Sequence, residues 1–148
     1  MKKVYIGCDH AALEMKAALV EYVKTLGFEV SDEGTYTSDS VNYPEYAKKV
    51  ALAVKNDENS LGVLICGTGI GMSLAANKVK GIRAAAVSEV YSAKLTRQHN
   101  DSNIVCIGAR VIGIETAKMI VEAFLTTEFE GGRHQTRVDM ITAIENEN

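Results

Sequence analysis

A cysteine followed by a glycine-rich segment has the clearest chemical potential in this sequence. Cys66 ends an apolar run, and the next residues read G-x-G-x-G, with Gly67, Gly69 and Gly71, before a helical pattern begins. Backbone N–H groups that no side chain hinders can stabilise an oxyanion, and a helix start favours the thiolate form of a nearby cysteine. Together they could take a proton from a carbon next to a carbonyl and stabilise the resulting negative charge.

Two other interpretations of this segment stay open on the residues alone. Cys66 could be a small buried apolar residue, as we expect for Cys8 and Cys106 in their own apolar runs. The glycines could instead hold a dinucleotide, and Glu89 stands at about the separation expected for a ribose-binding acid. However, the glycines follow the third apolar run rather than the first, and Met72 occupies the place of the last glycine of that motif.

Arg133 and Arg137, in "GGRHQTR", are one helical turn apart at or just before an expected helix start. Positive charge is unfavourable there unless an anion is present, and the arginine guanidinium suits phosphate. A solvated surface pair is the alternative. Arg110, at the end of "CIGAR", could join them or lie on the surface. The pair therefore predicts a phosphate site.

Apolar β-branched runs alternate with stretches of helical periodicity, and this alternation decides the fold class. The runs cover residues 3–8, 28–33, 61–66, 83–88 and 103–108, and the helical stretches cover 11–26, 45–55, 70–78, 90–98, 114–125 and 136–145. The pattern predicts a doubly wound α/β fold of the Rossmann or flavodoxin-like kind: a five-stranded parallel sheet, helices on both faces and an extra C-terminal helix.

Doubly wound sheets bind ligands at the carboxyl ends of their strands, where the strand order reverses. In a flavodoxin-like order the first and third strands are neighbours at that point. Asp9 and His10 follow the first strand, and Cys66 with its glycines ends the third. We therefore expect these residues around one crevice. His99 and Asn100, in "RQHNDSN", fall between a helix and the fifth strand, where a structural and a functional role are equally consistent with the sequence.

Size and composition limit the possible classes of protein. The chain has 148 residues, 47% of them apolar, and a formal charge of -3, which indicates one domain over residues 1–148 and argues against nucleic-acid or membrane partners. Its three cysteines are widely spaced without a C-x-x-C pair, so we expect free thiols. The apolar run near the start is too short for a signal peptide, which favours the cytoplasm.

Several motifs, in order along nearly the whole chain, resemble the ribose/galactose isomerase family. They are "GCDHAALEMK", "YPEYA", "GVLICGTGIGMSLAANKVKGIRAA", "TRQHND", "NIVCIGAR" and "GGRHQTRV". The resemblance implies interconversion of ribose 5-phosphate and ribulose 5-phosphate without a metal or organic cofactor. A six-carbon sugar phosphate such as galactose 6-phosphate or allose 6-phosphate, a free aldose, or a non-enzymatic nucleotide-binding module remain alternatives.

The resemblance also implies a role for each candidate residue. Cys66 is the base, Thr68 relays a proton, and His99 opens the sugar ring with help from Asp9. The remaining residues are expected to contact the enediolate, the sugar hydroxyls or the phosphate: Gly67, Gly69, Ile70 and Gly71; Asn100 and Tyr43; His10, Arg110, Arg133 and Arg137.

This assignment has a geometric consequence for assembly. His99 and Asn100 precede the fifth strand, whereas Cys66 and Asp9 follow the carboxyl ends of their own strands. A strand of about five residues separates the two edges by roughly 17 Å, too far for one small substrate to touch both. If all four residues serve one site, a second subunit supplies His99 and Asn100. We therefore expect a homodimer, or a tetramer built from dimers, with shared active sites.

Overall fold

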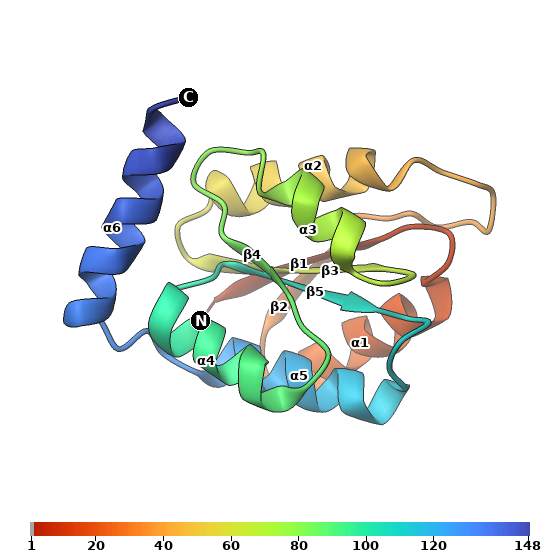
Figure 1. The fold of residues 1–148 in the computed structure, drawn as a ribbon. Helices are drawn as coiled ribbons and strands as arrows, with labels where there is room; N and C mark the ends of the chain where they lie inside the picture. Colours follow the sequence, from red (N-terminus) through yellow and green to blue (C-terminus); the bar gives the residue numbers. More distant parts are fainter. Residues whose placement is uncertain (1) are drawn as a thin grey trace.

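The computed structural model describes residues 2–148 and contains one parallel sheet (Figure 1). In this part of the chain the strands are β1 (Lys3–Cys8), β2 (Glu29–Asp32), β3 (Ser60–Cys66), β4 (Ala84–Ala86) and β5 (Ile104–Gly108). They lie in the order β2-β1-β3-β5-β4, and every neighbouring pair is parallel.

Helices cover both faces of the sheet. α1 (Leu13–Thr25), α4 (Val90–Asn100) and α5 (Ile114–Thr126) lie on one face, and α2 (Tyr43–Lys55) and α3 (Ile70–Ala76) lie on the other (Figure 1). α6 (Arg133–Asn146) contacts α4 and stands beside the sheet rather than on either face. The predicted doubly wound α/β fold with an extra C-terminal helix is therefore confirmed.

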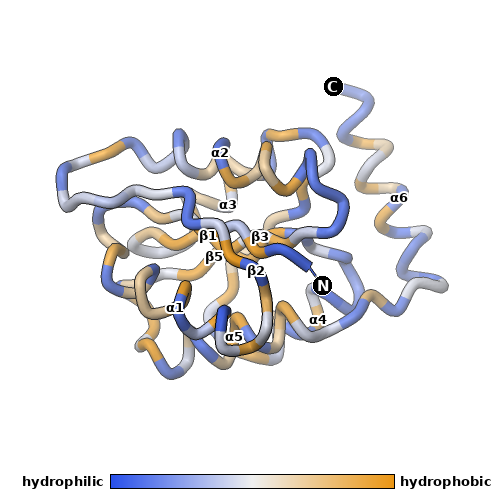
Figure 2. Tube along the Cα trace, turned by 180° about the vertical axis from the view of Figure 1, so that it is seen from behind, coloured by the Kyte–Doolittle hydropathy of each residue, from blue (hydrophilic) through white to orange (hydrophobic). Residues whose placement is uncertain are grey.

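The central strands β3 and β5 are buried along their whole length, because helices pack on both of their faces. Leu19 and Phe124 belong to the core under α1 and α5, while Val50 and Met72 belong to the core under α2 and α3. Figure 2 shows hydrophobic residues gathered along the central strands, with hydrophilic residues in the outer loops. These two cores fix the strand ends that carry the candidate residues.

The strand order reverses between β1 and β3, since β2 lies on one side of β1 and β3 on the other. Cys8 and Ile65 are paired in register, so Asp9 and His10 leave β1 beside Cys66. The prediction that the first and third strands are neighbours in the sheet is confirmed. One detail differs from the simple flavodoxin-like order: β5, and not β4, lies beside β3. β4 is short and partly exposed, which suits a sheet edge, whereas β5 is fully buried.

Two helix boundaries differ from the sequence prediction in ways that concern the site. α4 continues through His99 and ends at Asn100, and the next residue, Asp101, has a left-handed φ of 46°. α6 begins at Arg133, directly after Gly131 and Gly132, which both have positive φ. His99 and Asn100 are therefore held on the last turn of a helix rather than in a loop.

All three cysteines are free thiols, as predicted. Of the helices in residues 2–148, none combines the length and the apolar character needed to cross a membrane.

Candidate active site

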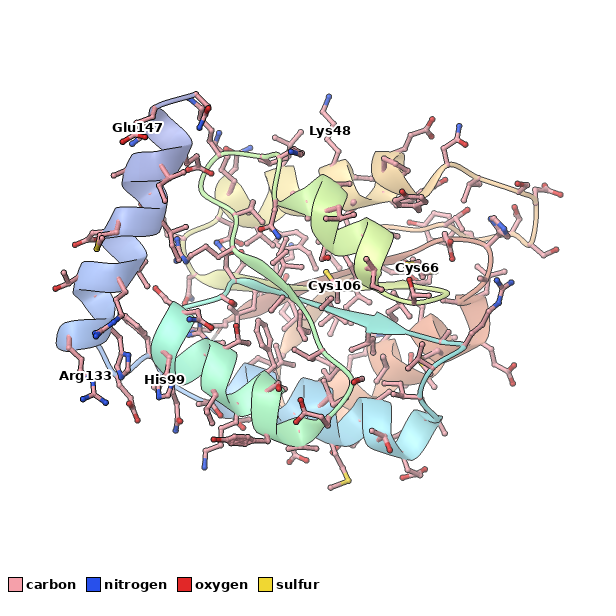
Figure 3. The ribbon with its side chains drawn as sticks, in the orientation of Figure 1. Lys48, Cys66, His99, Cys106, Arg133 and Glu147 are labelled. Atoms are coloured by element: carbon pink, nitrogen blue, oxygen red, sulfur yellow. The ribbon has the colours of Figure 1, made fainter. Side chains whose placement is uncertain are left out.

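The predicted site residues form two groups at opposite edges of the sheet. Cys66 is paired in register with Gly108, at the carboxyl end of β5, whereas His99 lies at the end of α4, shortly before β5 begins. Figure 3 shows Cys66 well apart from His99 and Arg133. We define the thiol group as Asp9, His10, Tyr43, Cys66, residues 67–71 and Arg110, and the arginine group as His99, Asn100, Arg133 and Arg137.

Cys66 is held by the glycine loop that follows it. The Gly69 N–H donates a hydrogen bond to Cys66 Sγ at 3.1 Å, and the Ile70 N–H donates to Thr68 Oγ1 at 3.2 Å. Gly71 is the second residue of α3, and the N–H groups of the first helical turn have no hydrogen-bond acceptor within the helix. The thiol therefore lies among backbone donors, as an oxyanion-stabilising site requires.

The glycines of this loop allow backbone to pack directly on backbone. Gly69 has a φ of 81°, and a Cβ there would lie 2.8 Å from the carbonyl carbon of Ile107. A Cβ on Gly108 would lie 2.7 Å from Thr68 backbone atoms. The loop is also tied to the segment after β5, since the Ala109 N–H donates to the Cys66 carbonyl at 2.8 Å. These contacts fix the position of the loop relative to Cys66.

Asp9 and His10 are both oriented by backbone groups. The Ala11 N–H donates to Asp9 Oδ1 at 2.9 Å, and the Asp9 N–H donates to the Ile65 carbonyl at 3.1 Å, which places the carboxylate beside the end of β3. The Val41 N–H donates to His10 Nδ1 at 3.1 Å. Because Nδ1 accepts this bond, neutral His10 carries its proton on Nε2, where it can donate to an anion.

Tyr43 and Arg110 border the same loop. The Tyr43 ring lies so close to Gly71 that a Cβ there would approach its Cε1 to 2.6 Å. Arg110 Nη1 lies 3.5 Å from the position a Cβ on Gly67 would take. The structure therefore brings every residue of the thiol group around one strand-end site.

The arginine group lines a separate cavity of about 400 Å³ between the end of α4 and the start of α6. Arg137 Nη1 donates to the Arg133 carbonyl at 3.0 Å, so the two arginines occupy one side of α6. Asn100 and His99 face the same cavity from α4. A histidine, an amide and two guanidinium groups are suited to a polar, negatively charged ligand.

His134 and Glu130 also belong to this region, and the sequence interpretation missed both. The His134 and His99 rings stack with centroids 4.2 Å apart, and Glu130 Oε1 lies 3.5 Å from His134 Nε2. Burial, reinforced by the charges of His99 and Arg133, lowers the pKa of His134 below its ordinary value of 6.5. His134 could have been predicted as a site residue, because it lies between the two arginines of "GGRHQTR". No sequence motif pointed to Glu130.

Buried charges hold the end of α4 in place. Arg97 is almost fully buried, and its Nη1 donates to Asp101 Oδ1 at 2.8 Å and to the Ser102 carbonyl at 2.7 Å. Arg83 Nε donates to the carbonyls of Asn100 and Asp101 at 3.0 and 3.1 Å. Side chains that satisfy the last carbonyls of a helix fix its terminus, and so fix His99 and Asn100.

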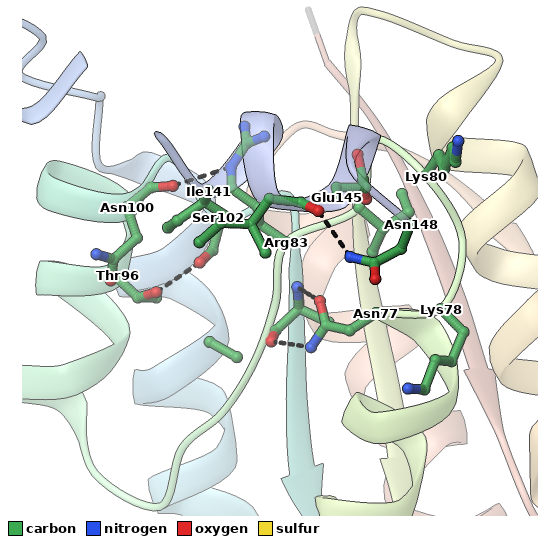
Figure 4. Close-up of a pocket in the computed structure, with 14 residues that line it drawn as sticks. Asn77, Lys78, Lys80, Arg83, Thr96, Asn100, Ser102, Ile141, Glu145 and Asn148 are labelled. Carbon is green, nitrogen blue, oxygen red and sulfur yellow. Dashed lines mark hydrogen bonds between the residues drawn. The ribbon is translucent and has the colours of Figure 1, made fainter. Parts of the chain in front are cut away.

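A larger groove of about 960 Å³ separates α6 from β4 (Figure 4). Several of its polar side chains are hydrogen-bonded to neighbours. The Asn77 amide exchanges two hydrogen bonds with the Ala84 backbone, at 2.9 and 2.7 Å, and Arg83 holds the Asn100 carbonyl. Of the predicted site residues only Asn100 lines this groove.

Comparison with known proteins agrees with this architecture. The family model described as Ribose/Galactose Isomerase matches residues 4–141. The chain is 55% identical over 145 residues to ribose-5-phosphate isomerase B of Escherichia coli strain K12, covering 98% of this chain and 97% of that protein.

Solved structures give the same result. Ribose-5-phosphate isomerase B of Clostridium thermocellum superposes with a TM-score of 0.95 at 48% identity, covering 98% of each chain. The Mycoplasma genitalium enzyme with bound ribulose-5-phosphate has a TM-score of 0.94 at 43% identity, covering 99% of this chain and 97% of the other. These matches span the sheet, both groups of residues and most of α6. The chain therefore belongs to the ribose/galactose isomerase family.

Proposed function

We propose that residues 1–148 form one aldose-ketose isomerase domain that interconverts ribose 5-phosphate and ribulose 5-phosphate. The observation that carries this proposal is the contact of 3.1 Å between Cys66 Sγ and the Gly69 N–H, inside a loop of backbone donors at the point where strand order reverses. The relatives named above, among them an enzyme with ribulose-5-phosphate bound, support the choice of sugar.

Cys66 acts as the base of the proton transfer. Its thiolate removes the proton from C2 of the open-chain aldose, and the electrons form an enediolate whose negative charge lies on the C1 oxygen. The amides of Gly67, Gly69, Ile70 and Gly71 stabilise that oxygen. The Cys66 thiol then returns the proton to C1, while Thr68 Oγ passes a proton from the C2 hydroxyl to the C1 oxygen. Every proton is accounted for in these steps, and the family resemblance implies that they proceed without a metal or organic cofactor.

The other residues open the sugar ring and hold the substrate. His99, with Asp9, moves the proton that opens the furanose, and Asn100 and Tyr43 contact the sugar hydroxyls. The phosphate is bound by His10, Arg110, Arg133 and Arg137. A phosphate far from the reacting carbons supplies binding energy that positions C1 and C2 at Cys66.

These roles require both groups of residues in one site, so we infer a homodimer with shared active sites. Within one chain the arginine group lies beside the amino end of β5 and the thiol group at its carboxyl end. Two exposed apolar surfaces support the inference, since a monomer would leave them in water. They are Ile70 and Leu74 on α3, and Met140 and Ile144 on α6, each more than half exposed. A tetramer built from such dimers fits the same requirement.

We place the enzyme in the cytoplasm, as the short apolar run near residue 4 favours. Both groups are proposed to contact features that many aldose phosphates share. Galactose 6-phosphate, allose 6-phosphate and free aldoses therefore belong in the test.

An isomerase assay on a panel of aldose phosphates and free aldoses, with and without a chelator, tests the function. We expect the highest kcat/KM for ribose 5-phosphate and no loss of activity with the chelator. A preference for a six-carbon phosphate would correct the substrate. A purified protein that carries bound nucleotide, seen by absorbance and mass analysis, and has no isomerase activity would support the nucleotide-binding alternative instead.

A further inference from the structure

Three potential metal ligands meet where α4, the segment before α6 and α6 itself come together. Glu130 Oε1 lies 3.5 Å from His134 Nε2 and 3.8 Å from His99 Nε2, and all three ligand atoms lie within 4.8 Å of one another. Glu130 is held near α4 because its N–H donates to the Gln98 carbonyl at 3.1 Å. Two imidazoles and one carboxylate form a common ligand set for Zn²⁺.

Two of the three separations between the ligand atoms are close to those of a tetrahedral site. Bonds of about 2.0 to 2.1 Å place tetrahedral ligand atoms roughly 3.3 Å apart. The two histidine–carboxylate distances exceed this by only a few tenths of an ångström. The imidazole planes are within 11° of parallel, so one ring must rotate out of the stack for both nitrogens to point at one ion. His99 is 39% exposed and has room to make this rotation.

Charges around the cluster act in both directions. Arg133 and Arg137 lie in the same cavity and oppose a cation, whereas the Glu130 carboxylate attracts one. The two imidazoles must bind a metal through unprotonated nitrogens, so binding is expected to weaken at acidic pH. A borderline-soft ion that bonds strongly to imidazole is therefore favoured over Mg²⁺ or Ca²⁺, which prefer oxygen ligands.

The geometry points to an inhibitory site for Zn²⁺ or a similar transition-metal ion, formed by His99, Glu130 and His134. A metal bonded to His99 Nε2 removes the nitrogen that would move the ring-opening proton. Metal binding and turnover are then mutually exclusive, and zinc acts as a reversible inhibitor. The inhibition rests on the proposed function of His99, whereas binding of the ion depends only on the three ligands.

Binding is measured first, in a Cys66→Ala background, so that the thiol cannot capture the metal. Zinc is titrated by calorimetry, and Co²⁺ is used as a spectroscopic probe. We expect one ion per chain and a visible tetrahedral cobalt band without the near-ultraviolet thiolate transition. Glu130→Gln and His134→Asn are each expected to weaken binding at least about tenfold. Glu128→Gln, a nearby exposed carboxylate outside the cluster, is the matched control and should bind normally.

Inhibition is measured second, with Cys66 present and each variant compared with its own metal-free activity. Zinc should inhibit the parent enzyme, a chelator should restore it, and Glu130→Gln should need at least about tenfold more zinc. Absence of binding in large metal excess, or binding that Glu130→Gln and His134→Asn leave unchanged, overturns the site. Far-ultraviolet circular dichroism checks the fold, and the isosteric Glu130→Gln carries the test if His134→Asn misfolds. If the protein binds the metal but has no isomerase activity, the proposed function is wrong and the proposed metal site is still supported.

Discussion

The Gly69 N–H donates to Cys66 Sγ across 3.1 Å, which ties the thiol to the backbone loop that follows it. The proposed base and the proposed anion-binding loop are therefore in direct contact. Loss of the sulfur should stop proton transfer while the loop remains available to hold substrate.

We expect Cys66→Ala to lower kcat by about 10³-fold or more, because general-base catalysis contributes about 10² to 10⁴ and no other side chain replaces the thiol. Ribose 5-phosphate binding, measured by calorimetry, should stay near the parent value. Cys8→Ala is the matched control, since Cys8 is a buried structural thiol, and it should keep its turnover. Near-normal kcat in Cys66→Ala would reject the base assignment.

Alkylation should distinguish the thiols in the parent enzyme. Burial raises the pKa of Cys8 to about 11 and raises the pKa of Cys106 strongly, and both side chains are fully inaccessible, whereas Cys66 is 6% exposed. Iodoacetamide near neutral pH should therefore modify Cys66 first, and sugar phosphate should slow the modification.

Gly69→Ala should destabilise the fold by about 1 to 3 kcal/mol, the usual cost of a non-glycine residue in the left-handed region. The 2.8 Å approach of its Cβ to Ile107 adds to this cost. Gly113→Ala is the matched control, because φ there is -84° and a Cβ would meet nothing within 4 Å. Urea unfolding of both variants measures the difference; equal free energies of unfolding would show that the loop tolerates a side chain.

Arg137→Ala should selectively weaken the binding of phosphorylated substrates. A hydrogen bond to a charged group contributes about 1.5 to 3 kcal/mol, and we expect a loss of kcat/KM of that order for ribose 5-phosphate. Free ribose, if it is turned over, should be little affected. Lys94→Ala, an exposed cation on α4 outside the cavity, is the control. Equal losses for the two sugars would mean that Arg137 does not touch the phosphate.

Mixed mutants should test the shared site. Cys66→Ala and His99→Asn homodimers should each be nearly inactive, because every site contains one fault. After unfolding and refolding together, a heterodimer contains one site with both faults and one with neither. Random pairing under two-fold symmetry gives roughly a quarter of sites intact, so activity should reappear. If subunits are shown to exchange and the mixture stays inactive, His99 acts within its own chain; an active His99→Asn homodimer would mean that His99 has no part in the reaction.

The folding stability of the protein should decrease at acidic pH because of His134. Its pKa is lower in the folded chain than its ordinary value of 6.5, chiefly through burial. Below about pH 6.5 the unfolded chain binds a proton that the folded chain resists, so folding stability declines as pH falls through this range. When the pH is lowered from about 7.5 to about 5.5, the melting temperature of His134→Gln should fall less than that of the parent protein. Thr136→Ala, an exposed position on the same helix, is the control and should follow the parent.

The sequence was sufficient to predict the sheet, because the apolar runs of β3 and β5 are buried on both faces and have no other stable environment. It was not sufficient to predict that α4 continues through His99 and Asn100. That extension depends on Arg83, which binds the last carbonyls from another part of the chain.

Long-range contacts also explain why the cluster of His99, Glu130 and His134 was missed. Glu130 approaches α4 through a backbone bond to Gln98, and no local pattern encodes that contact. The position of β5 beside β3 has the same character. β5 is buried along its whole length and β4 is partly exposed, and this difference arises only when the whole sheet is assembled.

The placement of Cys66 and His99 at opposite edges of one sheet has a kinetic consequence. If both residues serve one site, as proposed, a lone chain contains no complete catalytic centre, and turnover per chain depends on the protein concentration. Above the dissociation constant of the dimer, the rate rises in proportion to protein concentration. Far below it, the rate falls with the square of that concentration, and dilution alone switches the enzyme off.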